Sequence, residues 1–377
     1  MNHCIPTVTN KPVRTALYQA ALGTLASGLL VVSSAALSGT YIDSETRNTG
    51  TVKAVHAGEK KLVGWSVAFD NDILVPSSRD QDYTYGMSAT LAGTAARDSI
   101  VSLHQPLSRL NHWFNGDLKY SKQARHSIEA GLYGFTPEDI SRKDRNHDDR
   151  PFASLLYLSS SKQQPGITEN TSWRSTLTVG VLGLDVVGDL QNEVHRATNS
   201  DIAQGWDNQI SDGGELTARY SIARQRRWDI GNPNVEIKTT VQGSAGYLTE
   251  ASWGVSMRVG HLTTPWQSFN PELSTYRENA TEISGQNSGD GSYFLAGLAL
   301  KARAYNAFLQ GQFRNSDVSY HSDELNHGIV EAWLGYSHSF AGGYRASYIL
   351  RGHSSEVKSG AGDRNVIWGG LMLSQSF

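Results

Sequence analysis

After residue 60, the chain consists mainly of segments in which apolar and polar residues alternate with a period of two. Such alternation puts the apolar side chains on one face of an extended strand and the polar side chains on the other. The clearest examples, each with its charges on a single face, are residues 173–181, 215–222, 235–245, 252–259 and 344–351. This pattern in so many strands predicts a sheet between two different solvents, with lipid on one side and water on the other.

The segments add up to twelve predicted strands, which is an even number. They lie near residues 62–72, 82–93, 124–135, 152–161, 171–183, 214–226, 235–248, 251–262, 291–305, 328–340, 343–354 and 364–377. An even count lets the first and last strands pair antiparallel. Residues 306–316 allow a thirteenth strand, but an odd count would prevent that pairing, so we assign them to a loop. The predicted fold class is all-β: a closed antiparallel transmembrane β-barrel of about 12 strands.

One helix-like segment interrupts the alternation, between the fifth and sixth predicted strands. Leu190 and Val194 stack at positions i and i+4 of this helix, while Gln191, Asn192 and His195 gather on another face. Loops of membrane barrels are longer on the outer side and carry function. We therefore predict a short helix in an extracellular loop that carries a candidate chemical site. The alternative is an ordinary hydrogen-bonded surface histidine.

The remaining connections divide into short turns and long loops. Short turns at Gly342–Gly343 and near Thr249–Glu250 are typical of the inner end of a barrel. The long connections are residues 94–123, 136–151, 184–213, 263–290 and 317–327. We expect most of these to lie at the outer end.

Composition supports a membrane barrel and excludes other classes. The chain has 377 residues, a net charge of -3, 37 glycines, 16 tyrosines and 9 tryptophans. A polar average with many aromatic residues suits a barrel with a wet lumen, and the balanced charge gives no sign of nucleic-acid binding. Cys4 is the only cysteine, so a chain without its N-terminal segment has no disulfide.

The N-terminus resembles an export signal. Lys11 and Arg14 precede the apolar residues 16–37, which end in small residues suited to cleavage. The alternative is a membrane anchor, against which the small residues and the absence of a basic flank speak. The predicted organisation is a signal peptide at 1–38, a flexible leader at 39–60 and an outer-membrane β-barrel domain at 61–377. Such a chain would be exported to the bacterial outer membrane.

Four motifs occur in a fixed order along the barrel region. They are Phe69–Asp72, Asp82–Gly86, Tyr133–Asp139 followed by Asp149–Ala153, and Gln191–Arg196 followed by Gly205–Gln209. In this order and spacing, residues 62–377 resemble the outer-membrane lipid A 3'-O-deacylase family. The resemblance implies a twelve-stranded barrel, with an active site between the outer part of the wall and a helix of an extracellular loop. We expect the barrel to be a monomer. It also implies calcium-dependent hydrolysis of the 3'-linked acyl ester of lipid A in the lipopolysaccharide of the outer leaflet.

The resemblance assigns a role to each candidate residue. The roles are general base for His195, orientation of water or substrate for Gln191 and Asn192, the calcium site for Asn71, Asp72, Thr84 and Asp201, and contact with lipid A phosphates for Arg142 and Arg150. The chemistry agrees, because a neutral imidazole accepts a proton near neutral pH and calcium prefers hard oxygen ligands. The G-x-S-x-G signature of serine esterases does not occur in the sequence.

Other interpretations of the same residues stay open. Strict alternation places Asp70 and Asp72 on one face and Asn71 on the other, so a common site requires a bulge or twist. Thr84 also fits an ordinary strand, and Asp149–Arg150 also fits a structural ion pair in the wall. At the level of function, the alternatives are a non-enzymatic barrel (a pore or a structural protein) and an esterase that acts on phospholipids.

Overall fold

The computed structural model describes residues 59–75, 82–114, 124–166, 168–278, 283 and 290–377. All of them belong to one compact unit, Thr51–Phe377. The predicted signal peptide and residues 39–58 of the predicted leader lie outside the described residues. The last two leader residues are described: Glu59 accepts a 2.6 Å hydrogen bond from the main-chain nitrogen of His126.

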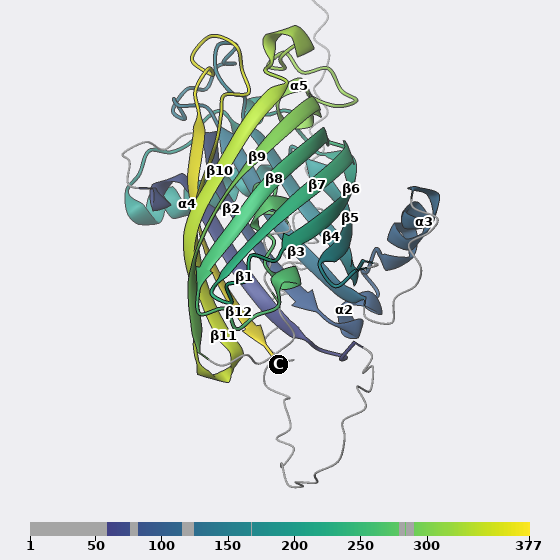
Figure 1. Ribbon diagram of the computed structural model, residues 1–377. Coiled ribbons are helices and arrows are strands. Elements are labelled where there is room, and N and C mark those ends of the chain that lie inside the picture. Colours follow the sequence, from purple (N-terminus) through teal and green to yellow (C-terminus); the bar gives the residue numbers. More distant parts are fainter. Residues whose placement is uncertain (1–58, 76–81, 115–123, 167, 279–282, 284–289) are drawn as a thin grey trace, which may run out of the picture. The chain divides into compact units, whose positions relative to one another are not determined.

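The described residues form twelve strands that close into one antiparallel barrel (Figure 1). The strands are β1 (Gly64–Asn71), β2 (Asp82–Ala92), β3 (Arg125–Thr136), β4 (Ala153–Pro165), β5 (Thr171–Leu182), β6 (Glu215–Trp228), β7 (Val235–Gly246), β8 (Leu248–Gly260), β9 (Gly291–Asn306), β10 (Gly328–Ser339), β11 (Tyr344–His353) and β12 (Val366–Ser376). Each strand pairs with its neighbours in sequence, and β1 pairs with β12. The predicted fold class and strand number are therefore confirmed. Residues 306–316 add no strand to the sheet, because β9 ends at Asn306 and a helical turn follows.

Short helices occupy the connections. They are α2 (Thr94–Arg97), α3 (His104–Phe114), α4 (Asp185–Thr198) and α5 (Ala307–Gln310), with 3-10 turns η1 (Asp72–Leu74), η2 (Trp206–Asn208), η3 (Trp266–Ser268), η4 (Pro271–Leu273), η5 (Ser322–Glu324) and η6 (Ala341–Gly343). Among the described residues, no helix has the length and apolar character needed to span a membrane. The predicted loop helix is α4.

Connections that follow odd-numbered strands lie at one end of the barrel, which we call the outer end because it carries α4. The long connections 136–151, 184–213 and 317–327 are at this end, whereas the connections from β2 to β3 and from β8 to β9 start and finish at the inner end. The turn predicted near Thr249–Glu250 was placed at the wrong end. The turn is at Tyr247, between β7 and β8, and therefore shares the outer end with α4.

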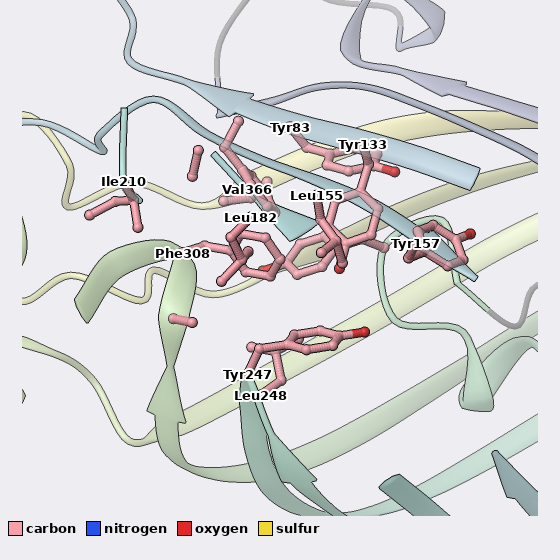
Figure 2. Close-up of a cluster of buried hydrophobic side chains, with 14 of the residues drawn as sticks. Tyr83, Tyr133, Leu155, Tyr157, Leu182, Ile210, Tyr247, Leu248, Phe308 and Val366 are labelled. Carbon is pink, nitrogen blue, oxygen red and sulfur yellow. The ribbon is translucent and has the colours of Figure 1, made fainter. Parts of the chain in front are cut away.

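An aromatic cluster fills the outer part of the lumen (Figure 2). Its members from β2 to β5, β8, β12, the turn before β8 and α5 include Tyr83, Tyr133, Phe135, Leu155, Leu182, Tyr247, Leu248, Phe308 and Val366. Tyr83 and Phe135 pair across β2 and β3, with ring centroids 5.6 Å apart. Since paired residues of neighbouring strands point to the same face, this pair marks the lumenal face of both strands.

The connection between β8 and β9 folds back into the lumen as a plug, residues 264–278, and Tyr276 of this plug belongs to the aromatic cluster. Its Glu272 meets Lys238 of the wall at 3.0 Å and accepts a 2.7 Å hydrogen bond from Ser256. Its Glu278 accepts a 2.9 Å hydrogen bond from Tyr133 and a 3.1 Å hydrogen bond from Thr178. The polar faces of the strands thus bind a polar segment of the same chain, which is why charges inside the barrel are tolerated.

The outward faces of the strands are apolar. Exposed large residues on them include Leu216, Val241, Trp253, Met257, Phe294, Leu298, Leu334 and Leu371. Aromatic residues gather near the inner ends of strands, among them Trp65, Trp173, Trp228 and Tyr344. An apolar band with aromatic residues at its edge is the surface that a transmembrane barrel presents to lipid.

Candidate active site

Helix α4 lies on the outside of the barrel wall, against β3 and β4. Val187, Gln191 and His195 recur every four residues along one stripe of the helix, and all three are buried. Val194 is exposed and Leu190 is half-buried. The face that the sequence marked as polar is therefore the face turned towards the wall.

Two contacts fix α4 at a short distance from the wall. The hydroxyl of Tyr85 on β2 donates to the main-chain carbonyl of Val187. Beneath the helix, β3 carries Gly134, where a Cβ atom would lie 2.7 Å from the Val187 side chain and 3.2 Å from the Trp206 ring. Since these distances are shorter than van der Waals contact, only glycine at position 134 allows the helix to approach this closely.

Trp206, in the turn η2, joins α4 to the wall. Its indole Nε1 donates a 2.9 Å hydrogen bond to Oε1 of Gln191. Its ring packs on Phe152 with centroids 5.0 Å apart. On the helix side, a Cβ atom at Gly188 would lie 2.5 Å from the ring. The indole therefore occupies the space that this glycine leaves.

The bond from Trp206 sets the orientation of the Gln191 amide. An indole N–H can only donate, so it selects Oε1 and leaves Nε2 on the other side of the amide. Nε2 of Gln191 is buried and has no hydrogen-bond partner within the described part of the chain. A buried N–H group without a partner is rare, and here it lies one helical turn from His195. The site thus holds an oriented, buried donor without a hydrogen-bond partner in the described part of the chain.

His195 is oriented by the loop that follows the helix. Its Nδ1 lies within hydrogen-bond distance of the main-chain carbonyl of Asp201. Because a carbonyl only accepts, Nδ1 carries the proton, and Nε2 is the basic nitrogen of the neutral ring. Helix α4 ends at this point: Asn199 has a φ of 54°, in the left-handed region, and Ser200 donates its N–H to the carbonyl of His195 at 2.9 Å.

Asn192 holds the same loop in place. Its Nδ2 donates to the carbonyl of Ala203 at 3.0 Å, and its Oδ1 accepts from the N–H of Ala203 at 2.9 Å. Both ends of the amide are thus engaged by main chain. This arrangement favours a role in positioning Asp201, and through it His195, over the direct orientation of water or substrate that the sequence suggested.

A second group of candidate residues lies where β1 ends and β2 begins. Asn71 donates from Nδ2 to the carbonyl of Thr84 at 2.7 Å, and its Oδ1 accepts from the N–H of Ile73 at 2.7 Å. Asp72 is buried and begins the 3-10 turn η1. Asp70 faces the lumen, where it pairs with Arg277 of the plug.

Two irregularities replace the strict alternation that would have separated these residues. Strand β1 ends at Asn71, so Asp72 no longer follows the strand pattern. In β2, the pairing with β3 shifts between Tyr83 and Tyr85, which leaves Thr84 as the extra residue of a β-bulge. Oγ1 of Thr84 lies 2.6 Å from Oγ1 of Thr136. The bulge is therefore in β2, whereas β1 pairs regularly with both of its neighbours as far as Asn71 and ends there without a bulge.

The chemistry of these residues fits calcium. Asn71, Asp72 and Thr84 offer an amide, a carboxylate and a hydroxyl, and calcium binds hard oxygen donors of these kinds. Asp201 differs, because its carboxylate is exposed and its main chain holds His195. Within the described ranges, no group of three or more histidine, cysteine, aspartate or glutamate residues gathers as a metal site. Any ion here would thus depend on amide, hydroxyl or substrate oxygens as well as on Asp72.

The two predicted phosphate-binding arginines lie in different surroundings. Arg142 is exposed, on the loop that runs beside η2, where Asn208 donates to the carbonyl of Lys143 at 2.8 Å. Arg150 is buried inside the barrel end, pairs with Glu356 and lies 4.7 Å from the ring centre of Phe135. The placement of Arg150 favours a structural ion pair, although the acidic partners of its side chain are Glu356 and, at 3.6 Å, Asp82 rather than Asp149.

Sequence reasoning gave no role to three residues that build the site. Tyr85 and Trp206 stand inside the noted motifs, and Gly188 stands in the middle of the predicted helix. A glycine in a helix interior lowers helix stability, so its presence there is a sign of close packing. No comparable sign in the sequence links Tyr85 to α4.

Comparison with known proteins places the fold. The family model described as outer membrane protein LpxR matches residues 30–377. LpxR from Salmonella typhimurium is 17% identical over 83% of this chain and 100% of its own, with a TM-score of 0.65. Two other barrels are less similar. The β domain of the Bordetella autotransporter BrkA is 11% identical over 84% of this chain and 100% of its own, with a TM-score of 0.38. The KdgM porin is 5% identical over 84% of this chain and 99% of its own, with a TM-score of 0.36. No curated protein sequence matches the chain.

Proposed function

The chain belongs to the outer membrane protein LpxR family, and from this premise we propose that it is a calcium-dependent lipid A 3'-O-deacylase. The proposed reaction is hydrolysis of the 3'-linked acyl ester, with His195 as general base. The observation that carries the proposal is the pairing of an oriented imidazole with the unpartnered Nε2 of Gln191 on one buried stripe of α4. A structural helix in a barrel loop needs neither feature.

In the proposed reaction, Nε2 of His195 accepts a proton from water, whose oxygen then attacks the ester carbonyl carbon. The hydrogen bond from Nδ1 to the carbonyl of Asp201 stabilises the imidazolium that forms. The same ring then returns the proton to the departing sugar oxygen, so that a fatty acid and a free hydroxyl leave. Nε2 of Gln191 donates to the oxyanion, which it can do without losing another hydrogen bond.

Asn71, Asp72 and Thr84 would hold the calcium ion, whose positive charge supports the developing oxyanion when it is bound. The hydrogen bond between Asn71 and Thr84 keeps the ends of β1 and β2 together for this purpose. Thr84 is followed by Tyr85, which binds α4, so the bulge connects the ion-binding residues to the helix of the general base.

The position of α4 suits a lipid substrate. The helix lies outside the wall at the outer end, so a lipid of the outer leaflet could reach the site sideways from the membrane. Val194 on its exposed face is apolar and would lie against acyl chains. The exposed Arg142 is the better placed of the two predicted arginines to meet a lipid A phosphate.

The filled lumen weighs against the pore alternative. The plug and the aromatic cluster occupy the lumen of the described barrel, and Glu272 and Glu278 are bonded to wall residues on several strands. A pore needs a continuous wet path. The phospholipid esterase shares all the proposed chemistry and differs only in its substrate.

The test is hydrolysis of lipid A by the purified, folded protein, followed by mass spectrometry. We expect loss of the 3' acyl chain with calcium and no loss with a chelator. His195→Ala should lower the rate by at least about 100-fold, while His261→Ala, at an exposed histidine of the inner end, should retain it. Unchanged lipid A with the intact protein and calcium would overturn the proposal. Release of fatty acid from phospholipids alone would favour the phospholipid esterase.

A further inference from the structure

Helix α3, which belongs to the inner-end connection between β2 and β3, lies on the outside of the wall (Figure 1). Just before it, the N–H of Leu103 donates to Oγ of Ser160 on β4 at 2.9 Å. At its far end, the ring of Phe114 stacks on Tyr220 of β6 with centroids 5.4 Å apart and planes inclined by 20°. The hydroxyl of Tyr220 donates to Asn111 at 2.9 Å.

The three wall positions under the helix form one row across the sheet. Ser160 pairs with Leu177 of β5, and Leu177 pairs with Tyr220. Helix α3 therefore crosses β4, β5 and β6 with its apolar side down, and Leu107 is completely buried beneath it. This is a packed position on the wall.

The part of the wall that α3 covers is more polar than the rest of the outward surface. Thr176 and Thr178 of β5 face the lumen, where Thr178 binds the plug, so Ser175, one residue before Thr176, faces outward. On β4, Tyr157 faces the lumenal cluster, so Ser160 faces outward. Both serines are nevertheless buried. Hydroxyl groups facing hydrocarbon are unfavourable without partners, and the helix removes them from that environment.

In covering the wall, the segment exposes apolar side chains of its own. Trp113 is 82% exposed and Phe114 is 68% exposed, and Ile100 and Val101 just before the helix are exposed as well. The other exposed positions of the helix include Arg109, which is polar. In water, four exposed large apolar residues between Ile100 and Phe114 would be unfavourable.

The position of α3 along the strands, relative to the outward tryptophans, shows whether lipid or water surrounds it. Trp173 lies four residues nearer the inner end of β5 than Leu177, and Trp228 lies eight residues nearer the inner end of β6 than Tyr220. Outward tryptophans mark the boundary between headgroups and hydrocarbon in membrane barrels. The row under α3 is thus on the hydrocarbon side of that boundary, and the exposed surface of α3 continues the lipid-facing wall.

We propose that α3 is an interfacial helix that replaces the lipid-facing surface of the wall over β4 to β6 and binds a phospholipid of the inner leaflet. Trp113 and Phe114, together with Val101, contact the acyl chains. The stem of Arg109 lies along the apolar surface, and its guanidinium reaches a headgroup phosphate. This binding site is separate from α4 and does not depend on the proposed enzymatic activity.

The test uses spin labels in the full chain, reconstituted in vesicles of phosphatidylethanolamine and phosphatidylglycerol. With Cys4→Ser as background, single labels are placed by Trp113→Cys on α3, Leu298→Cys on the lipid-facing side of β9, and Asp229→Cys in an exposed inner-end turn. Collision with oxygen, which concentrates in lipid, is compared with collision with a water-soluble nickel chelate. We expect the ratio of oxygen to nickel-chelate collisions to be the same for the labels at 113 and 298. For both labels this ratio should be several-fold higher than for the label at 229.

Three outcomes would overturn the proposal. In the first, the label at 113 collides with oxygen and with the nickel chelate as the label at 229 does, which would place it in water. In the second, the label at 113 is shielded from both probes. In the third, dipolar broadening between labels at 113 shows that a second copy of the chain occupies this surface. Since Trp113→Cys could disturb folding, the milder Trp113→Phe provides a second measurement. Brominated phospholipids should quench less tryptophan fluorescence in Trp113→Phe than in the unaltered protein, and an equal loss in both would contradict the proposal.

Discussion

A single hydrogen bond, from the indole of Trp206 to Oε1 of Gln191, decides which end of an amide faces the candidate site. Without it, the amide of Gln191 could turn by half a rotation and present an acceptor where the proposed oxyanion needs a donor. Trp206 is thus a positioning residue, since it acts on the reaction through Gln191.

Trp206→Phe is expected to lower kcat about fivefold and to leave KM nearly unchanged. The phenyl ring keeps the packing on Phe152 but removes the N–H, and a hydrogen bond of about 1 kcal/mol corresponds to a change of this size. Rates on lipid A over a range of concentrations measure both constants. In a Gln191→Ala background the same substitution should have no further effect. Additive losses in the double variant would mean that Trp206 acts through packing alone.

Other residue roles were partly accessible from the sequence. The resemblance pointed to His195, Gln191, Asn71, Asp72 and Thr84, and the helical period already put Gln191 near His195. It could not separate Asn192 from these residues, because a neighbour on a helix can bind either the substrate or its own loop. Arg150 posed the same difficulty, since its partner Glu356 is 206 residues away in the chain.

At the scale of elements, α4 docks on the wall because two glycines let it approach. Gly134 lies under the helix on β3, and Gly188 lies within the helix, facing the indole of Trp206. Alanine at either position would place a methyl group inside the contact distance of an atom that is itself fixed by packing. The distance between α4 and the wall is therefore set by the side chains of Val187 and Trp206, which lie directly against the two glycines.

Gly188→Ala is expected to displace α4 and to reduce lipid A hydrolysis strongly. Overpacking of about 1–3 kcal/mol opposes a gain of about 1 kcal/mol in helix propensity. The barrel strands should be unaffected, so the temperature at which the folded form is lost on gels should stay the same. Asp189→Ala, at an exposed position of the same helix, is the control and should retain activity. Full activity in Gly188→Ala would show that the helix adapts to the added methyl group.

The strands were predictable because the two faces of the wall have different solvents, which imposes a period of two on every strand. Strict alternation separates Asn71 from Asp72, so the sequence showed that a common site needs an irregularity near these residues. It did not show that the irregularities would be a bulge at Thr84 and the end of β1 at Asn71. The turn at Tyr247 was placed at the wrong end because its shortness suggested the inner side, although counting strands from β1 assigns it to the outer end. The plug has no periodic pattern, and its partners on the wall are distant in sequence.

At the scale of the whole molecule, ion pairs connect the outer end of the barrel. Glu356, in the connection between β11 and β12, pairs with Arg150 from the connection between β3 and β4 and with Arg303 of β9. Burial by itself would raise the pKa of the Glu356 carboxyl, but the two guanidinium groups outweigh burial and hold this pKa well below its ordinary range. The carboxylate therefore stabilises the folded barrel.

Because the pKa of Glu356 is lower in the folded chain than in the unfolded one, its contribution to stability is complete above the ordinary glutamate range near pH 4.5. The contribution is lost as the pH falls towards the folded pKa. Glu356→Gln should lower the free energy of unfolding by about 3 kcal/mol at neutral pH, because it leaves two buried guanidinium groups less well paired. The difference from the unaltered protein should shrink in acid.

Thermal unfolding in detergent at neutral pH and near pH 3 measures this prediction. Glu169→Gln, at an exposed glutamate of an inner-end turn, is the matched control and should not change stability at either pH. A Glu356→Gln variant as stable as the control at neutral pH would contradict the stabilising role of the carboxylate.

The plug also constrains the order in which the barrel can be assembled. Residues 264–278 follow β8 in the chain, and the wall groups that bind Glu278 and Glu272 come from β3, β5, β7 and β8, all made earlier. The seam between β1 and β12, by contrast, joins the two ends of the barrel domain and has to wait for the final strand. We therefore expect the plug to bind the open sheet of the strands already made, before β1 pairs with β12. The plug would then act as a template during biogenesis, because the remaining strands close around it. The alternative, in which the plug enters a barrel that has already closed, would not be needed.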